Sequence, residues 1–259
     1  MKISVLIPMY NEENCVGPTA DALVRAMDGL CSGAGREYEI ILSDDGSSDG
    51  TLTIAENKSA EYPGKIRVIS SPVNRGKGAA IRRAVLASEG DCVVFTDCDL
   101  AYGTDVIGEA VRIMEETGAD LVIGSRAIHP EGYEGYTRLR KTASRAFKKM
   151  LAMRAGFRLT DSQCGFKAIR AGAARDLFEN SVTDGWSFDF EILMLAQKRG
   201  YDVREMPVKV LIHKESRIRV FRDGLKMARD VGRIKKRVRN LPDKKDPRGA
   251  GGAAGEDQA

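Results

Sequence analysis

Four short apolar runs alternate with helical segments, and this alternation most constrains what the chain can fold into. The runs are typical of buried strands and cover 3–8, 38–43, 66–69 and 92–95. Between them, helical spacing or a glycine-broken helix start marks 16–30, 51–60 and 77–88. An order of β-α-β-α-β-α-β predicts an α/β fold with a mostly parallel, doubly wound sheet and helices on both faces.

Polar loops follow three of the predicted strands, at the ends where such sheets bind ligands. They begin after Pro8, after Ser43 and after Thr96, and the last of them contains Asp97 and Asp99. Residues two apart on a strand share one side, so we expect the two carboxylates to lie together. Such a pair is typical of a Mg²⁺ or Mn²⁺ site completed by substrate phosphates, whereas a polar turn is the alternative. The convergence of three polar loops favours the metal site.

A glycine-broken turn adds a cation at the same ends of the strands. Gly76, Lys77 and Gly78 open the third predicted helix, where backbone N–H groups and a lysine form a natural phosphate contact. An exposed turn lysine is the alternative interpretation. The turn does not fit the P-loop pattern GxxxxGK[ST], and it lacks the GxGxxG of dinucleotide-binding folds. These two nucleotide-binding classes are therefore excluded.

Composition indicates a soluble globular protein. Of 259 residues, 42% are hydrophobic and 30% are charged, with a modest net charge of +4. No apolar run reaches the roughly 18–20 residues of a membrane span, and Met1–Val5 enters a strand without room for a signal peptide. The five cysteines show no CxxC pairing, which favours reduced thiols in the cytoplasm. His129 and His213 are isolated and are interpreted as structural or surface residues.

An ordered series of motifs resembles family-two glycosyltransferases of the GT-A fold, whose sheet is Rossmann-like. The first four are Ile7–Glu12, Ser43–Thr51, Asn74–Gly78 and Asp97–Leu100. Three later motifs resemble the branch that makes polyprenyl-phosphate-linked hexoses, and they are Gly124–Arg126, Thr160–Lys167 and Trp186–Glu191. Within that branch the dolichyl-phosphate glucose synthases are nearest and the mannose synthases next. The resemblance extends over roughly Met1 to Arg239.

The chain departs from the pattern of the family, or of its branches, in three features. Cys98 stands where the family usually has a small alanine. Ala101-Tyr102-Gly103 stands where mannose synthases usually carry glutamine and prolines, which weakens the mannose interpretation. The eukaryotic glucose enzymes have an N-terminal membrane anchor that is missing here, so we expect a prokaryotic soluble or peripheral form.

The resemblance implies a metal-dependent, inverting hexosyltransferase. It would move a hexose, with UDP-glucose as the first expected donor, to a polyprenyl or dolichyl phosphate with Mg²⁺ or Mn²⁺. The alternatives are a GDP-mannose-dependent polyprenyl-phosphate mannose synthase and a family-two transferase with a saccharide hydroxyl as acceptor. A hydroxyl acceptor would need a carboxylate base and usually a QxxRW-like motif, which the chain lacks. A phosphate with a second pKa of about 6 is already an ionised nucleophile at neutral pH.

Two further classes of protein explain the sequence less well. A sugar-nucleotide pyrophosphorylase would carry a glycine-rich signature after Ile7, which is absent. A basic module that only binds nucleic acid or membrane would leave the aspartates at the strand ends without a role.

The resemblance also assigns the site residues. The residues expected to bind the metal are Asp97 and Asp99. The nucleotide-binding residues are Pro8, Tyr10, Glu12, Asp44, Asp45, Lys77, Asp97 and Cys98. The catalytic residues are Asp97, Asp99, Arg126, Gln163 and Asp189. The residues around the acceptor and its phosphate are Arg126, Asp161, Gln163, Trp186, Glu191, Ser216 and Arg217.

Several of these residues have a structural alternative. Asp44 and Asp45 could cap a helix, and Arg126 could form a surface salt bridge. Asp189 and Glu191 could simply favour a helix N-terminus, where negative charge is stabilising. Trp186 is either a platform for a sugar or a core residue.

Two basic segments differ from the rest of the chain. Residues 135–160 carry eight cations and no carboxylate. Along 217–241 apolar residues recur at helical spacing, and cations flank them: Arg219, Arg222, Lys226, Arg229, Arg233, Lys236 and Arg237. The second pattern predicts a helix lying in a membrane interface, and a surface helix packed on the catalytic domain is the alternative.

We therefore divide the chain into a catalytic domain (1–215), a basic amphipathic membrane-interface helix (216–241) and a disordered tail (242–259). The expected partners are a nucleotide-sugar donor, a polyprenyl or dolichyl phosphate, an anionic membrane surface and a second copy of the chain, but no nucleic acid. The expected location is cytoplasmic, peripheral at the cytoplasmic face of the membrane.

Overall fold

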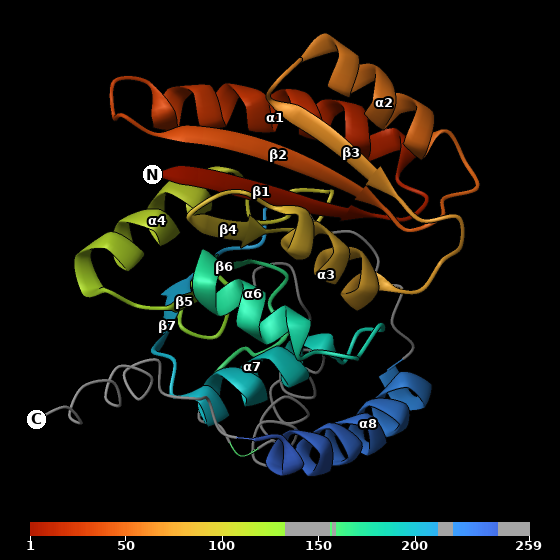
Figure 1. Ribbon diagram of the computed structural model, residues 1–259, viewed down its shortest axis with the longest axis vertical. Coiled ribbons are helices and arrows are strands. Elements are labelled where there is room, and N and C mark those ends of the chain that lie inside the picture. The colour runs from red at the N-terminus through yellow and green to blue at the C-terminus, as the bar shows by residue number, and fades with distance from the viewer. Residues whose placement is uncertain (133–155, 157–158, 212–219, 243–259) are drawn as a thin grey trace, which may run out of the picture.

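A seven-stranded sheet forms the centre of the protein, with the strand order β3-β2-β1-β4-β6-β5-β7 (Figure 1). The structure is a computed structural model that describes residues 1–132, 156, 159–211 and 220–242, and for 220–228 only the backbone. The strands are β1 (Lys2–Met9), β2 (Glu37–Asp44), β3 (Ile66–Ser70), β4 (Cys92–Phe95), β5 (Leu121–Ser125), β6 (Lys167–Arg170) and β7 (Val203–Pro207).

One strand breaks the parallel arrangement. Strand β6 runs antiparallel to both of its neighbours, β4 and β5, whereas all the other pairs are parallel. The chain runs from β1 outward to β2 and β3 and then returns to β4 on the other side of β1. This reversal makes the carboxyl ends of β1 and β4 the topological switch point, where sheets of this type bind ligands.

The helices cover both faces of the sheet, so the predicted doubly wound α/β fold is confirmed. They are α1 (Glu13–Cys31), α2 (Thr51–Glu61), α3 (Lys77–Ala87), α4 (Asp105–Thr117), α6 (Ala171–Glu179), α7 (Phe188–Arg199) and α8 (Val220–Asn240). Because side chains alternate along a strand, Ile3, Val5 and Ile7 of β1 face the core under α1 and α4. Leu6 faces the opposite core, under α3, α6 and α7.

Helix α7 is buried on nearly every side, because it lies between α6 and α8 (Figure 1). All nine residues from Phe188 to Ala196 are buried. A helix without a polar face is typical of a position between two layers. The second layer is α8, whose residues Val231, Ile234 and Val238 belong to the core around α7.

The described half of α8 therefore matches the alternative prediction, a helix whose apolar stripe packs on the catalytic domain. Among its described cations, Arg233 keeps 76% of its side chain exposed, whereas Arg237 turns inward to Glu191. None of the described helices combines the length and the apolar character that a membrane span requires. The predicted domain boundary at 215–216, the segment 135–155 and the tail from 243 lie outside the described residues.

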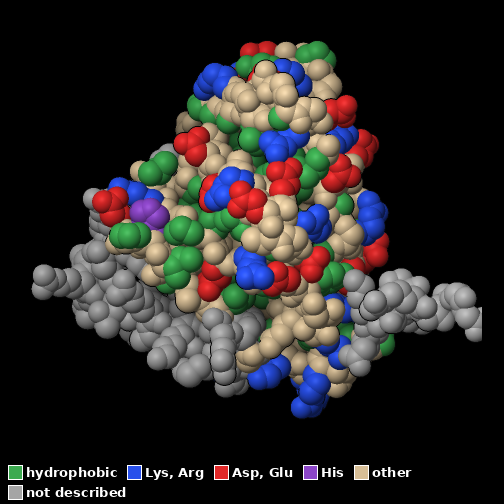
Figure 2. Space-filling model, turned by 90° about the vertical axis from the view of Figure 1, so that its left-hand side faces the viewer, with side chains coloured by type: hydrophobic (Ala, Val, Ile, Leu, Met, Phe, Trp, Pro, Cys, Tyr) green, Lys and Arg blue, Asp and Glu red, His purple; other side chains and the backbone are tan. Residues whose placement is uncertain are grey.

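On the face drawn in Figure 2, acidic and basic side chains are interspersed.

Candidate functional site

The loops after β1 and β2 hold one another at the carboxyl edge of the sheet. The backbone N–H of Asn11, a residue with a φ of 53°, donates to Ser47 Oγ at 2.9 Å. The side-chain oxygen of Asn11 accepts from the backbone N–H of Ser48 at 2.9 Å. The N–H of Glu12 donates to Thr51 Oγ1 at 2.7 Å. Two loops that were predicted to converge are thus joined side by side.

This pairing fixes the predicted nucleotide wall. Pro8 and Glu12 are partly buried, and Tyr10 between them leaves 41% of its surface exposed. An exposed aromatic ring beside a polar loop offers a flat apolar surface for a ligand.

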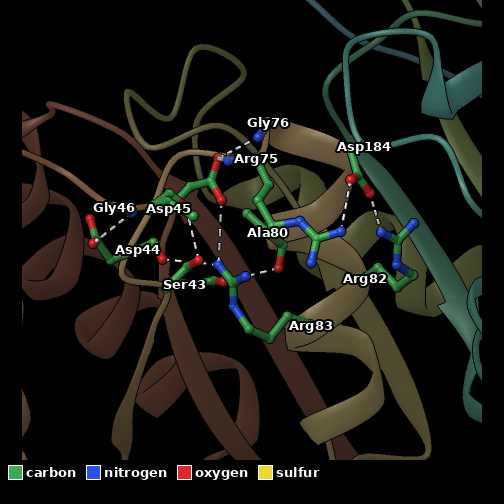
Figure 3. A network of polar contacts seen from close by, with 12 residues as sticks. Ser43, Asp44, Asp45, Gly46, Arg75, Gly76, Ala80, Arg82, Arg83 and Asp184 are labelled. Carbon is green, nitrogen blue, oxygen red and sulfur yellow. Dashed lines mark hydrogen bonds and ion pairs between the residues drawn. The ribbon is translucent and has the colours of Figure 1, made fainter.

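Asp44, at the end of β2, mainly closes its own turn (Figure 3). Its Oδ2 accepts from the backbone N–H groups of Gly46 and Ser47 at 3.1 and 3.2 Å, and its Oδ1 accepts from Ser47 Oγ at 2.5 Å. The N-cap position of α2 is Gly50, and Asp49 Oδ1 accepts from the N–H of Thr51, the first residue of the helix, at 3.0 Å. Asp44 is therefore a turn former and not a helix cap.

Asp45 is buried but keeps a free acceptor. Its Oδ2 accepts from the N–H of Arg75 at 3.1 Å and from the N–H of Gly76 at 2.6 Å (Figure 3). Its Oδ1 lies 3.6 Å from Nη2 of Arg83 and has no hydrogen-bond partner. A buried carboxylate oxygen without a partner is costly, so a ligand N–H or O–H placed there would stabilise the site.

The two aspartates predicted to bind a metal follow β4 in a turn and not on the strand. Strand β4 ends at Phe95, and the N–H of Leu100 donates to the carbonyl of Asp97 at 3.0 Å. Leu100 has a φ of 48°, and Asp99 Oδ1 accepts from the N–H of Ala101 at 3.1 Å. Strand alternation therefore does not set the directions of Asp97 and Asp99, and that step of the prediction was wrong. Cys98 between them is buried in the core under α1 and α4.

Asp97 already attracts a cation, the ammonium of Lys77 at the start of α3. Burial lowers the pKa of the Lys77 ammonium, but Asp97 and Asp189 outweigh this effect and raise it, so the lysine stays charged. The Lys77 Nζ also lies 5.4 Å from the centroid of the Trp186 ring. Gly165 packs so closely on the Asp97 carboxylate that a Cβ at this position would collide with Oδ2.

A second lysine–carboxylate pair lies near the first. Lys167 on β6 has no exposed surface, and its Nζ contacts Asp189 Oδ1 at 2.5 Å and the carbonyl oxygen of Cys164 at 2.8 Å. Burial raises the pKa of the Asp189 carboxyl, and the Lys167 and Lys77 ammonium groups oppose that shift. Sequence analysis had not identified Lys167 as a site residue, although it lies within a motif that resembles the family.

Arg126 and Asp161 were predicted separately and lie together. Arg126 Nε contacts Asp161 Oδ2 at 2.6 Å, and Nη2 contacts Oδ1 at 2.9 Å. This two-point contact fixes the plane of the guanidinium, and the Asp161 carboxylate is fully buried. Asp161 therefore orients Arg126, and Gln163 lies partly buried two residues further on.

Two further predicted residues, Trp186 and Glu191, lie on the segment before α7 and on α7 itself. Trp186 is 53% exposed, which is incompatible with the core alternative. Glu191 is fully buried and accepts from the N–H groups of Val182 and Thr183 at 2.9 and 2.7 Å. It also accepts from Arg237 Nη1 of α8 at 2.7 Å. Ser216 and Arg217 lie outside the described residues.

The residues at Asp97 fit a divalent cation bound together with phosphates. Among the described residues there is no group of three His, Cys, Asp or Glu side chains that could hold a metal. Mg²⁺ needs no such group, because it usually takes one or two carboxylates and completes its shell with phosphate oxygens and water. The contact between Asp97 and an ammonium group is the evidence that this carboxylate is placed to bind a cation.

Comparison with known proteins agrees with the fold. The family model described as glycosyl transferase family 2 matches residues 4–178. A dolichyl-phosphate beta-glucosyltransferase from Trichomonas vaginalis is 34% identical over 236 residues, which cover 88% of this chain and 69% of that protein. The dolichyl-phosphate beta-glucosyltransferase of Saccharomyces cerevisiae is 31% identical, over 88% of this chain and 72% of its own.

A solved structure, the glucosyl-3-phosphoglycerate synthase from Mycobacterium tuberculosis in complex with Mn²⁺, UDP and glucosyl-3-phosphoglycerate, shares the fold. The TM-score is 0.66 at 23% identity, over 93% of this chain and 81% of that one.

Proposed function

The chain belongs to glycosyl transferase family 2, and we propose that it transfers glucose from UDP-glucose to a dolichyl or polyprenyl phosphate. The relatives at 31–34% identity described above carry the name dolichyl-phosphate beta-glucosyltransferase, which supports both the sugar and the acceptor.

The observation that carries this proposal is the pairing of the carboxylates on the acceptor side. Each is already bound to a cation of the protein, in the pairs Arg126–Asp161, Lys167–Asp189 and Arg237–Glu191. A carboxylate held in this way is poorly placed to take a proton from a sugar hydroxyl. A lipid phosphate needs no base, because it is already ionised at neutral pH. The site therefore favours a phosphate acceptor over a hydroxyl acceptor.

The donor side is assigned to the loops after β1, β2 and β4. Asp45 offers its unpartnered Oδ1 to the nucleoside, and Tyr10 offers its exposed ring. Pro8, Glu12, Asp44 and Cys98 shape the wall behind them. Lys77 lies at the start of α3, where backbone N–H groups favour anions. Its ammonium group can therefore move from Asp97 to a diphosphate bound there.

Asp97 and Asp99 are assigned to hold Mg²⁺ or Mn²⁺ with the donor diphosphate. When bound, the metal neutralises the charge that grows on the leaving nucleoside diphosphate. The structurally similar synthase from Mycobacterium tuberculosis has been solved with UDP and either metal. Residues of this chain then supply the remaining positive charge, with Lys77 on the donor side and Arg126 on the acceptor side.

On the acceptor side, Asp161 holds the guanidinium of Arg126 in the plane needed for two-point contact with a phosphate. Gln163, Trp186 and Asp189 border the space for the sugar, with Ser216 and Arg217 assigned to the lipid phosphate. Direct displacement by the phosphate oxygen inverts the anomeric centre, so an α-linked donor gives a β-linked product. Catalysis then consists of positioning and charge stabilisation.

An acceptor panel tests the proposed function. With Mg²⁺ and labelled UDP-glucose, we expect transfer to polyprenyl phosphate and none to glucose or a saccharide primer. The rate should be steady above pH 7 and fall near pH 6, as the lipid phosphate gains its second proton. GDP-mannose in the same assay separates the mannose alternative. Transfer to a saccharide hydroxyl, with none to lipid phosphate, would show that the acceptor is wrong.

We further propose that the outer face of α8 binds an anionic membrane surface, which would place the enzyme peripherally at the cytoplasmic face. Arg229, Arg233 and Lys236 are exposed, while the apolar stripe of the same helix is buried on α7. Each such cation contributes on the order of 1 kcal/mol near anionic lipid. Changing all three to glutamine should abolish co-sedimentation with phosphatidylserine vesicles at low salt, while UDP affinity stays unchanged.

The matched control removes the same charge elsewhere, from three exposed arginines on α1, α6 and β7: Arg25, Arg175 and Arg204. This variant should still sediment with the vesicles at low salt and detach at high salt. Equal loss in both variants would mean that net charge, and not α8, controls the binding.

A further inference from the structure

The segment of residues 180–187 connects α8 to the start of α3. It carries Trp186, the one tryptophan of the chain, and it leads directly into α7. It contacts both α3 and α8, so a change at α8 can reach the donor site through it.

On the α3 side the segment packs closely against the start of the helix. The Asp184 carboxylate binds Arg75 Nη2 at 3.1 Å and also contacts Arg82, and both contacts are drawn in Figure 3. The carbonyl of Asp184 accepts from the N–H of Ala79 at 3.2 Å. Gly76 has a φ of 113°, and a Cβ there would lie 2.6 Å from that carbonyl oxygen. A shift of the segment toward α3 would therefore press on the first turn of that helix, which carries Lys77.

On the other side Glu191 holds the backbone of the segment. Its Oε2 accepts from Val182 N–H at 2.9 Å and Thr183 N–H at 2.7 Å, and the carboxylate has no exposed surface. A buried carboxylate is stable only when a cation compensates it. That cation is Arg237, which comes from α8, 46 residues further along the chain.

The Arg237 guanidinium makes a second contact with the same segment. Nη1 binds Glu191 Oε1 at 2.7 Å, and Nη2 donates to the carbonyl of Asn180 at 2.7 Å. Helix α8 adds one more link, from Ser187 Oγ to Asp230 Oδ2 at 3.3 Å. The fork of an arginine suits such a two-point contact, which a lysine cannot reproduce.

We propose that Arg237 is a positioning residue for the donor site: through Glu191 and Asn180 it sets where the 180–187 segment stands against α3. The described hydrogen bonds of the Arg237 side chain go to Glu191 and Asn180, and not to the donor loops. The consequence is that the helix whose outer face is assigned to the membrane also holds the segment beside Lys77 in place. This inference rests on the proposed donor site, although the position of the segment can be measured without any substrate.

Arg237→Met tests the proposal, with Arg239→Met as the control, because Arg239 is an exposed cation on the same helix. The first readout is acrylamide quenching of Trp186 fluorescence in the ligand-free protein. The second is the steady-state kinetics of UDP-glucose. We expect Arg237→Met to raise the quenching constant and the KM for UDP-glucose, with kcat/KM for the donor falling roughly 10- to 100-fold. Arg239→Met should match the wild-type protein in both readouts.

A role in folding alone would lower the active fraction and leave the KM for UDP-glucose unchanged. A folded Arg237→Met variant with wild-type quenching and donor KM would overturn the proposal. If Arg237→Met does not unfold cooperatively, Arg237→Lys is tested by the same two readouts, Trp186 quenching and the KM for UDP-glucose. If neither variant folds, the proposal is also overturned. If UDP-glucose proves not to be the donor, the proposed function fails, while the quenching of Trp186 still decides this inference.

Discussion

Replacing Asp97 with asparagine is expected to lower glucosyl transfer at least about 1,000-fold, which corresponds to about 4 kcal/mol of transition-state stabilisation. The charge of this carboxylate is what the site offers to a metal–diphosphate complex. Asparagine has nearly the same shape and keeps the close fit against Gly165. The variant therefore removes the charge without opening a cavity.

The same variant should keep its fold. The pair between Asp97 and Lys77 is partly exposed on the aspartate side, and pairs of this kind contribute about 1 kcal/mol or less. Lys77 still has Asp189 nearby to compensate its charge. We expect the midpoint of thermal unfolding in the absence of metal to stay within a few degrees of the wild-type value.

The control for Asp97→Asn is Asp105→Asn, an exposed aspartate in the first turn of α4. It should lose little activity, and Asp99→Asn should behave like Asp97→Asn. Isothermal titration with UDP and Mn²⁺ adds a readout besides turnover, because the metal-dependent part of UDP affinity should vanish in both site variants. Transfer near the wild-type rate in either variant, with Mg²⁺ or Mn²⁺, would refute the metal assignment.

The first half of the fold could be predicted because the local sequence pattern of each segment agrees with the element that it forms. The predicted strand 38–43 is observed as Glu37–Asp44, and the predicted helix 51–60 is observed as Thr51–Glu61. The second half could not be predicted in the same way. Strand β6 has four residues and begins with a buried lysine, so neither its length nor its polarity marks it as a central strand. Its antiparallel direction depends on the tertiary structure.

In the site, too, the sequence indicates individual residues, whereas their contacts depend on the tertiary structure. Asp97, Arg126 and Asp161 follow from motifs, whereas the partner of each depends on where distant elements pack. Arg237 is the clearest case: its place on the polar side of an amphipathic helix predicts contact with lipid headgroups. In the structure it turns inward to Glu191 instead, so that part of the prediction was wrong. Only the burial of Glu191 on α7 explains why a cation is needed there.

Lys167 leads to the largest expected change in stability. Replacing it with methionine should lower the free energy of unfolding by about 3–5 kcal/mol, the usual cost of leaving a buried charge without its partner. The ammonium has no exposed surface, and it holds both Asp189 and the carbonyl of Cys164. Methionine fills a similar volume, so the loss comes from the charge and not from a cavity. Urea unfolding of the ligand-free variant measures the change.

The double variant Lys167→Met with Asp189→Asn separates a lost partner from lost packing. Removing both charges leaves no uncompensated carboxylate, so most of the stability should return, and the two substitutions should be strongly non-additive. The double variant should nevertheless transfer glucose poorly, because Asp189 is assigned to the site and Lys77 would lose one of its two carboxylate neighbours. A double variant as unstable as Lys167→Met alone would mean that Lys167 acts through its contact with Cys164. In that case Asp189 would not be the reason for a buried cation on β6.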